Sequence, residues 1–290
     1  MSSRCLIFMF TVSATIVCIR DTWPVSVKRA TSWACARAMK LVKATAVVTG
    51  ASGAIGSAIA GMLSNAGANV VLVGRRLPAL EATAANIGGG VPISCDVTSE
   101  AEVEQLFSKI MDDIGPCDLL VNVAGINAPA PTVDLTAAAF SNVMAVNVLG
   151  PFLCSREAFK HMQTPSAAAG DAAAAKSRGG RIINVGSISA MSPRPHSAAY
   201  TTSKYALQGL THSLALDGRA HGIAVGVVHP GNVISEMLSP EEIARRQASE
   251  GFITPEDVAA SVTHMAALPE TANVLEMTVI PTTQPLVGRG

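Results

Sequence analysis

The sequence predicts an α/β protein built on a single doubly wound parallel sheet of about seven strands, with helices on both faces. Segments rich in β-branched residues alternate with helix-like segments, and the first of them runs into a glycine-rich turn. Strands separated by helices of this length pair in parallel through right-handed crossovers. Aromatic residues make up only 4% of the chain, so Ala, Val, Ile and Leu must form the core, which suits helices layered on a parallel sheet.

The pattern assigns the elements in order. Lys43–Thr49 is a β-branched run that ends at glycines, and Ala54–Asn65 follows it as a helix. Ser99 is a candidate N-cap with Glu102 three residues later, the spacing of a capping box. The expected strands are 43–49, 70–73, 91–95, 118–122, 181–185, 223–229 and 274–280. The expected helices are 54–65, 77–87, 100–113, 140–162, 197–219 and 255–267.

Composition limits the class of protein. The chain has 290 residues, enough for one large domain with a sizeable core. Its 21 basic and 21 acidic residues balance, which argues against a nucleic-acid-binding protein, and its 49% hydrophobic content excludes disorder. Seven basic residues and one acid fall within residues 1–43. We therefore expect an N-terminal extension over 1–43 and a folded domain over 44–290, with a low-complexity insertion at 164–178.

The extension has three interpretations. Residues 5–19 are mostly apolar and are flanked by Arg4 and Arg20, but a helix needs roughly 20 apolar residues to span a bilayer, so the run is closer to a signal-peptide core. The Arg- and Ser/Thr-rich stretch after it resembles an organelle transit peptide. Translation could also begin at Met39, which would leave the rest as a non-native extension.

Localisation follows from the cysteines and the extension. The six cysteines form no CxxC pair and do not have the spacing of metal ligands. We therefore expect free thiols in a reducing compartment, and we expect no metal site. This favours the cytoplasm. A mitochondrial or other organellar location, or membrane association through residues 5–19, stays open.

A glycine-rich turn, Thr49–Gly56, joins the first strand to the first helix. Glycines there let the backbone approach a pyrophosphate, which the helix N-terminus can bind. Asp96 and Asn122–Gly125 follow the next strands, at the sheet edge where open sheets bind ligands. A turn without any ligand is the alternative. The predicted dinucleotide-binding residues are Gly50, Ser52, Gly53, Ile55, Gly56, Asp96, Val97, Asn122, Ala124 and Gly125.

The end of the second strand bears on cofactor choice. An acid there would hold ribose hydroxyls, but the chain has Gly74 followed by Arg75 and Arg76. Two guanidinium groups could bind a 2′-phosphate. The sequence therefore favours NADP(H) over NAD(H), with ordinary solvated arginines as the alternative.

Tyr200 and Lys204 are one helical turn apart. A phenol titrates near 10, so it exchanges protons at neutral pH only if a nearby cation stabilises the phenolate. Ser187 lies thirteen residues before Tyr200, where its hydroxyl could polarise a substrate oxygen. Asn147 could interrupt its helix and order a water near the lysine.

From Lys43 onward the chain strongly resembles the short-chain dehydrogenase/reductase family. The resemblance rests on Thr49–Gly56, Asp96, Asn122–Gly125, Asn147, Ser187, Tyr200-x-x-x-Lys204 and Pro230-Gly231. It implies a catalytic tetrad with Tyr200 as acid/base and Ser187 as the carbonyl-binding donor. Lys204 would lower the tyrosine pKa and bind ribose, and Asn147 would hold a proton-relay water. The implied cofactor contacts also include Tyr200, Lys204, Pro230, Gly231, Val233 and Ser235.

Two features depart from or compete with this pattern. Ala54 stands where the family has glycine, and its methyl group could crowd the pyrophosphate. Ser189 competes with Ser187, although its spacing to Tyr200 is two residues short. Ser189, Arg194 and His196 are candidate substrate contacts, and His229 could touch the nicotinamide or be a neutral strand-end histidine.

The resemblance implies an enzyme acting on CH–OH donors: an NADP(H)-dependent carbonyl reductase or secondary-alcohol dehydrogenase. No Lys or Arg lies between Asn122 and Ser155, unlike family members that hold an acidic carrier protein. Thr254–Val258 and Leu275–Thr278 resemble NADP-dependent 3-hydroxy acid or broad-range alcohol dehydrogenases. The expected partners are a small carbonyl or alcohol substrate and further copies of the chain, as a homodimer or homotetramer. A catalytically silent dinucleotide-binding regulatory or scaffold protein is the alternative.

Overall fold

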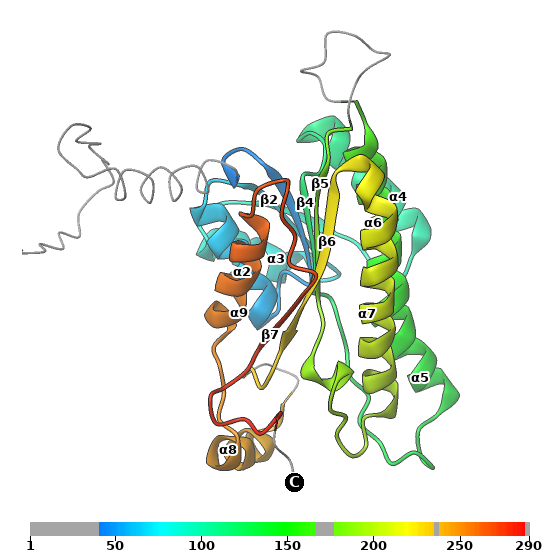
Figure 1. The fold of residues 1–290 in the computed structure, drawn as a ribbon, viewed down its shortest axis with the longest axis vertical. Coiled ribbons are helices and arrows are strands. Elements are labelled where there is room, and N and C mark those ends of the chain that lie inside the picture. Colours follow the sequence, from blue (N-terminus) through cyan, green and yellow to red (C-terminus); the bar gives the residue numbers. More distant parts are fainter. Residues whose placement is uncertain (1–40, 166–176, 235–237, 288–290) are drawn as a thin grey trace, which may run out of the picture. The chain divides into compact units, whose positions relative to one another are not determined.

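A computed structural model of the protein describes residues 41–165, 177–234 and 238–287. In this part of the chain, seven strands form one parallel sheet in the order β3-β2-β1-β4-β5-β6-β7, which confirms the predicted fold class (Figure 1). The strands are β1 (Thr45–Thr49), β2 (Asn69–Gly74), β3 (Val91–Ser94), β4 (Leu119–Asn122), β5 (Gly180–Val185), β6 (Ile223–Pro230) and β7 (Glu276–Val279). Residues 1–40 of the predicted extension, residues 166–176 of the predicted insertion and Ser235 lie outside the described residues.

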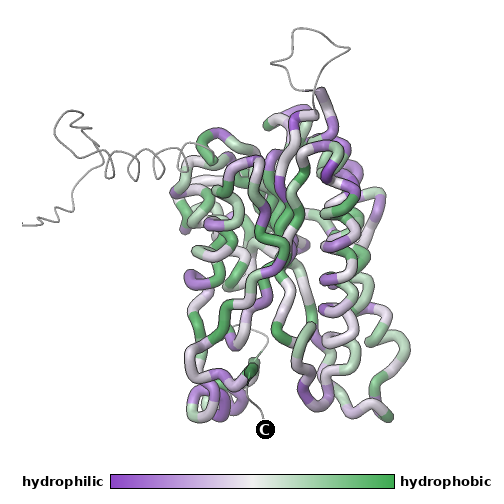
Figure 2. The backbone as a smooth tube through the Cα atoms, viewed as in Figure 1, coloured by the Kyte–Doolittle hydropathy of each residue, from purple (hydrophilic) through white to green (hydrophobic). Residues whose placement is uncertain are grey.

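Helices cover both faces of this sheet. Helices α2, α3 and α9 pack on one face, and α4, α6 and α7 on the other (Figure 1). The strands between them are the most hydrophobic part of the fold, whereas hydrophilic residues lie along the outer helices (Figure 2). The helical elements are α2 (Ala54–Asn65), α3 (Leu77–Asn86), α4 (Glu100–Asp113), α5 (Ala137–Met144), η1 (Ala145–Leu149), α6 (Gly150–Gln163), η2 (Ile188–Ala190), α7 (Ala198–Gly218), η3 (Arg219–His221), α8 (Pro240–Ser249) and α9 (Pro255–Ala266).

The strand order determines where a ligand can bind. Strand β1 lies between β2 and β4, so the chain crosses from one half of the sheet to the other between β3 and β4. In open parallel sheets this switch point leaves a crevice at the carboxyl ends of the strands. The glycine-rich turn follows β1 directly and therefore lies at that crevice.

One predicted helix proved to be three elements. The sequence predicts a continuous helix over 140–162, but α5 and α6 are joined by the π-helical turn η1. A π turn inserts one extra residue into the helical ladder. Asn147 lies in this turn, so the expected interruption of the helix at that residue is confirmed.

Helix α8 was absent from the prediction. None of its side chains is buried, and Ile243 is its only large apolar residue, so the segment is too short and too polar on average to stand out as a helix in the sequence. A reciprocal capping box begins it, because the Ser239 hydroxyl accepts from the backbone of Glu242 and the Glu242 carboxylate accepts from that of Ser239.

The predicted capping box of α4 is only half formed. The Ser99 hydroxyl accepts a 3.4 Å hydrogen bond from the backbone N–H of Glu102. The Glu102 carboxylate instead accepts a 2.8 Å bond from the backbone of Asp96. Glu102 therefore supports the loop after β3, next to the crevice.

Candidate active site

A cleft of about 270 Å³ opens at the carboxyl ends of β1, β2, β3 and β4. It is lined by almost all of the residues predicted at the glycine-rich turn and at the ends of the second, third and fourth strands, whereas the implied cofactor contacts Tyr200, Lys204, Pro230, Gly231 and Val233 do not line it. Those that line it are Gly50, Ser52, Gly53, Ile55, Gly56, Arg75, Arg76, Asp96, Val97, Ala124 and Gly125. Residues from four separate turns thus meet in one concave site.

The turn between β1 and α2 requires glycine at two positions. Gly50 has a φ of +65°, and a Cβ atom there would lie 2.8 Å from the backbone nitrogen of Ala124. A Cβ atom on Gly56 would lie 2.2 Å from the carbonyl oxygen of Gly50. Gly53 caps α2 without a side-chain hydrogen bond, so the first N–H groups of α2 have no side-chain acceptor at the cap. This cradle fits a pyrophosphate.

The far end of the cleft carries positive charge. Arg75 and Arg76 follow β2, line the cleft and are exposed to solvent. Asp96 faces them after β3, where its carboxylate accepts bonds of 2.9 and 2.8 Å from the backbone N–H and hydroxyl of Thr98. The N–H of Thr98 is the main cause of the lowered pKa of Asp96, and the charge of Arg75 adds to it. Asp96 is therefore ionised and stably oriented.

The side chain of Asn122 does not line the cleft, unlike its neighbours Val123–Ile126. It is buried and donates a 2.9 Å hydrogen bond to Asn184 on β5. The loop after β4 is held instead by the Thr49 hydroxyl, which accepts bonds from the backbones of Val123 and Ala124. Asn122 thus positions the cleft wall from inside the core.

Lys204 and Tyr200 lie on the same face of α7, beside the cleft. The Lys204 ammonium lies 5.5 Å from the centre of the Tyr200 ring and donates a 2.9 Å hydrogen bond to the carbonyl of Val185. Only 4% of Lys204 is exposed. Burial lowers its pKa to about 8, because removal from water disfavours the charged form.

Ser187 follows β5 and reaches the same tyrosine. Burial raises the pKa of Tyr200, and a hydrogen bond with the Ser187 side chain opposes that shift. The backbone N–H of Ser189 instead donates a 3.1 Å hydrogen bond to the Ser187 hydroxyl. Ser187 is therefore the serine that contacts the tyrosine.

Asn147 completes the cluster. Its carboxamide accepts a 2.8 Å bond from the backbone N–H of Ile126 and donates a 2.9 Å bond to the carbonyl of the same residue. A Cβ atom on Gly125 would lie 3.4 Å from the Asn147 carboxamide oxygen and 3.7 Å from the Lys204 ammonium nitrogen. Asn147 and Lys204 therefore converge on the backbone of the loop after β4.

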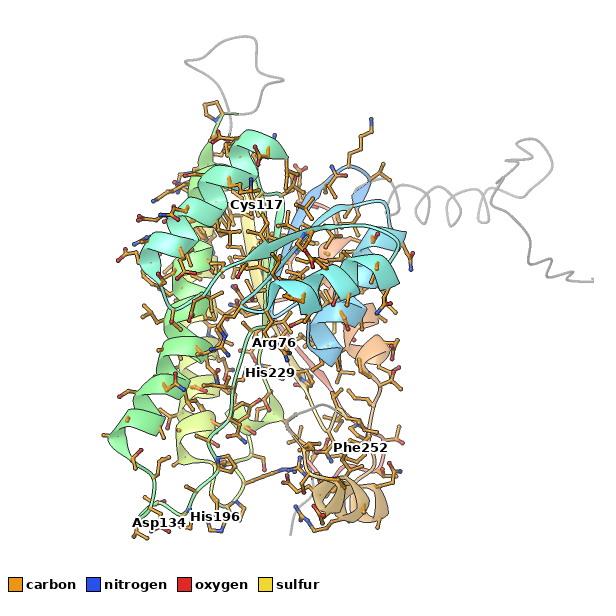
Figure 3. The ribbon with its side chains drawn as sticks, turned by 180° about the vertical axis from the view of Figure 1, so that it is seen from behind. Arg76, Cys117, Asp134, His196, His229 and Phe252 are labelled. Carbon is orange, nitrogen blue, oxygen red and sulfur yellow. The ribbon has the colours of Figure 1, made fainter. Side chains whose placement is uncertain are left out.

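His229 is completely buried, so it does not face the cleft. Its Nδ1 lies 3.0 Å from the carbonyl oxygen and 3.3 Å from the backbone nitrogen of Ser187. Figure 3 shows it at about the level of Arg76, between Cys117 toward one end of the molecule and His196 toward the other. Burial lowers its pKa, so the ring is neutral at pH 7. Its contacts hold the backbone of Ser187 in place.

Arg194 and His196, which were predicted as substrate contacts in the loop before Tyr200, have different surroundings in the structure. Arg194 bonds to Asn232 and Glu250, at 2.9 and 2.6 Å. His196 is exposed at a left-handed φ of +60°, and its carbonyl accepts a bond from Ala130. The partners of Arg194 were missed by sequence reasoning. One sequence feature could have indicated Asn232 as a partner: it is a polar residue between Gly231 and Val233, in the segment after the sixth strand.

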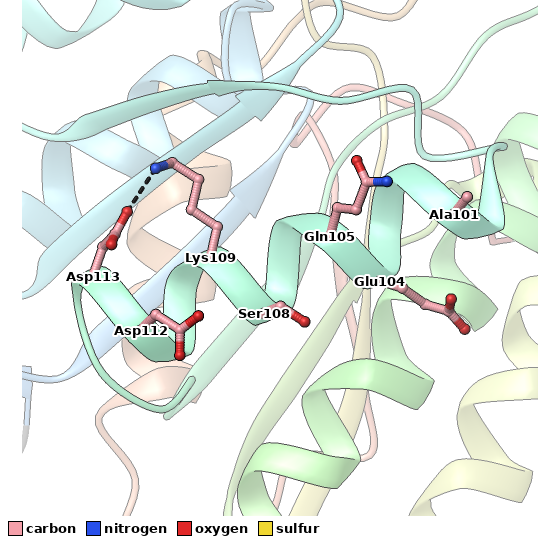
Figure 4. Close-up of a pocket in the computed structure, with 7 residues that line it drawn as sticks. All are labelled: Ala101, Glu104, Gln105, Ser108, Lys109, Asp112 and Asp113. Carbon is pink, nitrogen blue, oxygen red and sulfur yellow. Dashed lines mark hydrogen bonds and ion pairs between the residues drawn. The ribbon is translucent and has the colours of Figure 1, made fainter.

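Another groove lies on α4 and measures about 460 Å³ (Figure 4). All its lining side chains come from this one helix, and Lys109 and Asp113 form an ion pair across it at 2.6 Å. It contains none of the predicted site residues. Within the residues that the structure describes, no group of three or more His, Cys, Asp or Glu side chains could hold a metal ion.

Comparison with known proteins agrees with this geometry. A family model described as short chain dehydrogenase matches residues 44–246. A short-chain dehydrogenase/reductase of Armillaria gallica is 34% identical over 241 residues, covering 77% of this chain and 88% of that protein. A 3-oxoacyl-(acyl-carrier-protein) reductase of Rickettsia bellii is 34% identical over 77% of this chain and 89% of that protein. A solved dehydrogenase/reductase structure from Sinorhizobium meliloti 1021 has 34% identity and a TM-score of 0.74, covering 85% of this chain and 97% of that chain.

Proposed function

Because the chain belongs to the short-chain dehydrogenase/reductase family, and is thus an oxidoreductase of alcohols or carbonyl compounds, we propose that it is an NADP(H)-dependent carbonyl reductase or secondary-alcohol dehydrogenase. In this proposal Tyr200 is the general acid/base. The observation that carries it is the cluster of Tyr200, Lys204 and Ser187 beside a cleft whose glycine turn fits a pyrophosphate.

Each side chain of the cluster has a distinct chemical task. A bound nicotinamide dinucleotide supplies or accepts the hydride. The Ser187 hydroxyl holds the substrate oxygen, and Tyr200 donates a proton to it during reduction and removes one during oxidation. Lys204, with a pKa of about 8, is mostly cationic at pH 7 and stabilises the phenolate. Asn147 holds the loop that faces Lys204 and supports a water-mediated path for the proton.

The preference for NADP(H) over NAD(H) is supported by Arg75 and Arg76. Both are exposed, line the cleft after β2 and can reach a 2′-phosphate without breaking an ion pair in the described part of the chain. Gly74 leaves no acid there to repel that phosphate. Charge-assisted bonds to phosphate are among the strongest that proteins make.

Cofactor choice can be reversed by design. A Cβ atom on Gly74 would lie 3.4 Å from Leu80, an ordinary contact, so an aspartate is tolerated there. Gly74→Asp with Arg75→Ile should lower NADPH affinity at least roughly tenfold and increase relative preference for NADH. The kcat/KM ratio for the two cofactors measures this, with Arg219→Ile, an exposed arginine outside the cleft, as the charge control. A parent enzyme that already prefers NADH would refute the proposal.

We propose a small, freely diffusing substrate. The loop and helix between Asn122 and Ser155 contain no Lys or Arg that could hold an acidic carrier. NADPH oxidation in the presence of ketones, aldehydes and 3-oxo acids tests this, with an acyl-carrier thioester as comparison. Binding of NADPH without turnover of any compound would instead favour the silent, regulatory alternative.

Assembly and location are further parts of the proposal. Leu149, Phe152 and Tyr205 are each at least 40% exposed on the η1, α6 and α7 segments, and a homodimer or homotetramer would cover them. Sedimentation measures the assembly, and a monomer at micromolar concentration would contradict it. We propose a cytoplasmic location, which fractionation of cells expressing the full chain tests.

A further inference from the structure

Asn232 is held from four directions, although it lies in a short loop after β6. It is 4% exposed. Its backbone N–H donates to the Gln284 side chain over 3.0 Å, and its carbonyl accepts from Ile253 over 2.9 Å. Its carboxamide accepts from Arg194 and donates to Glu250, each at 2.9 Å. A loop residue with this many partners has one orientation.

Glu250 lies at the centre of these contacts. One oxygen of its carboxylate accepts from Arg194 at 2.6 Å, from Asn232 at 2.9 Å and from Gln284 at 3.2 Å. The exposed fractions of the Arg194 and Glu250 side chains are 25% and 17%, so water screens this ion pair less than a fully exposed one. A single carboxylate thus joins the loop before Tyr200, the loop after β6 and the C-terminal segment.

Two glycines, Gly231 and Gly251, allow the backbone to accommodate these contacts. A Cβ atom on Gly231 would lie 2.1 Å from the Gln284 carboxamide oxygen, so only glycine leaves room for that side chain. Gly251, with a φ of +73°, ends α8 and lets the chain turn so that its carbonyl meets Asn232 at 3.2 Å. The carbonyl of Glu250 itself accepts from Thr283 at 2.8 Å. The backbone carbonyls of both Glu250 and Gly251 are therefore held by hydrogen bonds.

We propose that Glu250 is a positioning residue for the nicotinamide end of the active site. By holding Asn232 it fixes the backbone of 230–233, and by holding Arg194 it fixes the loop that carries Tyr200 onto α7. Arg194 is thereby a structural partner of Glu250 and not a receptor for a substrate carboxylate. The inference rests on the proposed function and on the expectation, implied by the family resemblance, that Pro230, Gly231 and Val233 contact the cofactor.

The test compares Glu250→Ala, Glu250→Gln and Glu242→Ala in the full chain. Glu242 is the matched control, since it lies in α8, the helix that ends just before Glu250, and likewise pairs with an arginine, Arg246, at 3.0 Å, whereas the carboxylate that binds Asn232 is that of Glu250. Hydrogen exchange at the Asn232 and Ile253 amides reports the loop directly, with or without NADPH. Steady-state kinetics then separates KM for NADPH from kcat.

Glu250→Ala should speed exchange at both amides about tenfold and raise KM for NADPH by a similar factor, with a smaller change in kcat. Glu250→Gln keeps an acceptor for Asn232 and should recover most of the loss, whereas Glu242→Ala should change neither quantity. Unchanged exchange in Glu250→Ala overturns the proposal. So does an equal loss in Glu250→Ala, Glu250→Gln and Glu242→Ala, which would indicate only the stability of α8. If no substrate turns over, the proposed function fails, yet hydrogen exchange still decides whether Glu250 positions the loop.

Discussion

The chemistry of Tyr200 depends on neighbours that are partly withdrawn from water. Burial raises the pKa of the phenol, and Ser187 opposes that shift through its hydrogen bond. Burial also lowers the pKa of Lys204 to about 8, so the lysine changes charge close to neutral pH. Burial therefore shifts the two pKa values in opposite directions. In each case it disfavours the charged form, which is the phenolate for Tyr200 and the ammonium ion for Lys204.

Tyr200→Phe tests the proton-transfer role. The substitution keeps the ring and its packing but removes the transferable proton, so kcat should fall by about 10²–10⁴, the range typical of general acid/base catalysis. NADPH affinity, followed by fluorescence titration, should change little. A variant that retains most of its rate would exclude Tyr200 as the acid/base.

Lys204 makes stability depend on pH in a defined direction. Its pKa of about 8 in the folded chain lies below the ordinary value of 10.5, so between these values the unfolded chain binds more protons. The free energy of unfolding then rises with pH. Below pH 8 the lysine is charged in both states, and the cost of burying that charge is at its largest.

Lys204→Met removes this titration. Relative to the variant, the wild type should gain stability between pH 8 and 10, by a few kcal/mol at most, on the order of 1.4 kcal/mol per pKa unit. Urea unfolding of both proteins in reducing buffer measures the difference. Buried Cys95, whose pKa burial raises to about 12, is present in both proteins, so its opposite trend cancels. A difference that is flat with pH would show that Lys204 is not desolvated.

At the scale of elements, the turn between β1 and α2 limits what the cleft can be. Gly56 belongs to α2, yet its missing side chain is what allows the helix to approach the carbonyl of Gly50. Ala54, which directly follows Gly53 and lies two residues before Gly56, begins α2 and lines the same cleft. Ala54 is therefore accommodated at the cleft, whereas a methyl group at Gly56 has no space.

Gly56→Ala should abolish measurable NADPH binding and destabilise the fold by roughly 1–3 kcal/mol, because the backbone must shift to relieve the overlap. Gly61→Ala is the matched control in the same helix, since its nearest neighbour would be Ile87 at 3.4 Å. Alanine is the better helix former, so that variant should be neutral or slightly more stable. Thermal melting and NADPH titration of both variants check this, and equal behaviour would contradict the role assigned to the turn.

At the scale of the whole molecule, all seven strands lie between Thr45 and Val279. Among the described residues, which begin at 41, the two hydrophobic clusters that pack on the faces of the sheet use side chains from Leu41 onward. The described fold therefore draws its core from the region that the sequence predicted as the domain over 44–290, together with a few preceding residues.

A chain that begins at Met39 should consequently fold and bind NADPH like the full chain. Circular dichroism melts and fluorescence titration of the two proteins provide the comparison. Loss of solubility or of cooperative melting on truncation would mean that the first 38 residues contribute to the fold. That outcome would also weaken the interpretation of this segment as a targeting or non-native extension.

The sequence by itself determined the features that depend on neighbours along the chain. The alternation of strands and helices was visible because burial repeats with the period of each element. The glycine turn and the Tyr200–Lys204 pair were visible because each acts within a few residues. Helix ends were predicted within a few residues wherever an apolar face marked them, as for α2, whose bounds match the prediction.

Only the tertiary structure decided which polar groups meet across the fold. Asn122 turns into the core because Asn184, 62 positions away, receives its hydrogen bond there. Arg194 pairs with Glu250, 56 positions away, just after α8, a short and mostly polar helix that the sequence did not predict. Such contacts follow from how separate strands and loops are brought to one end of the sheet, where most of the buried polar groups find a partner. No local pattern in the chain encodes that choice, so it appears only when the sheet is assembled.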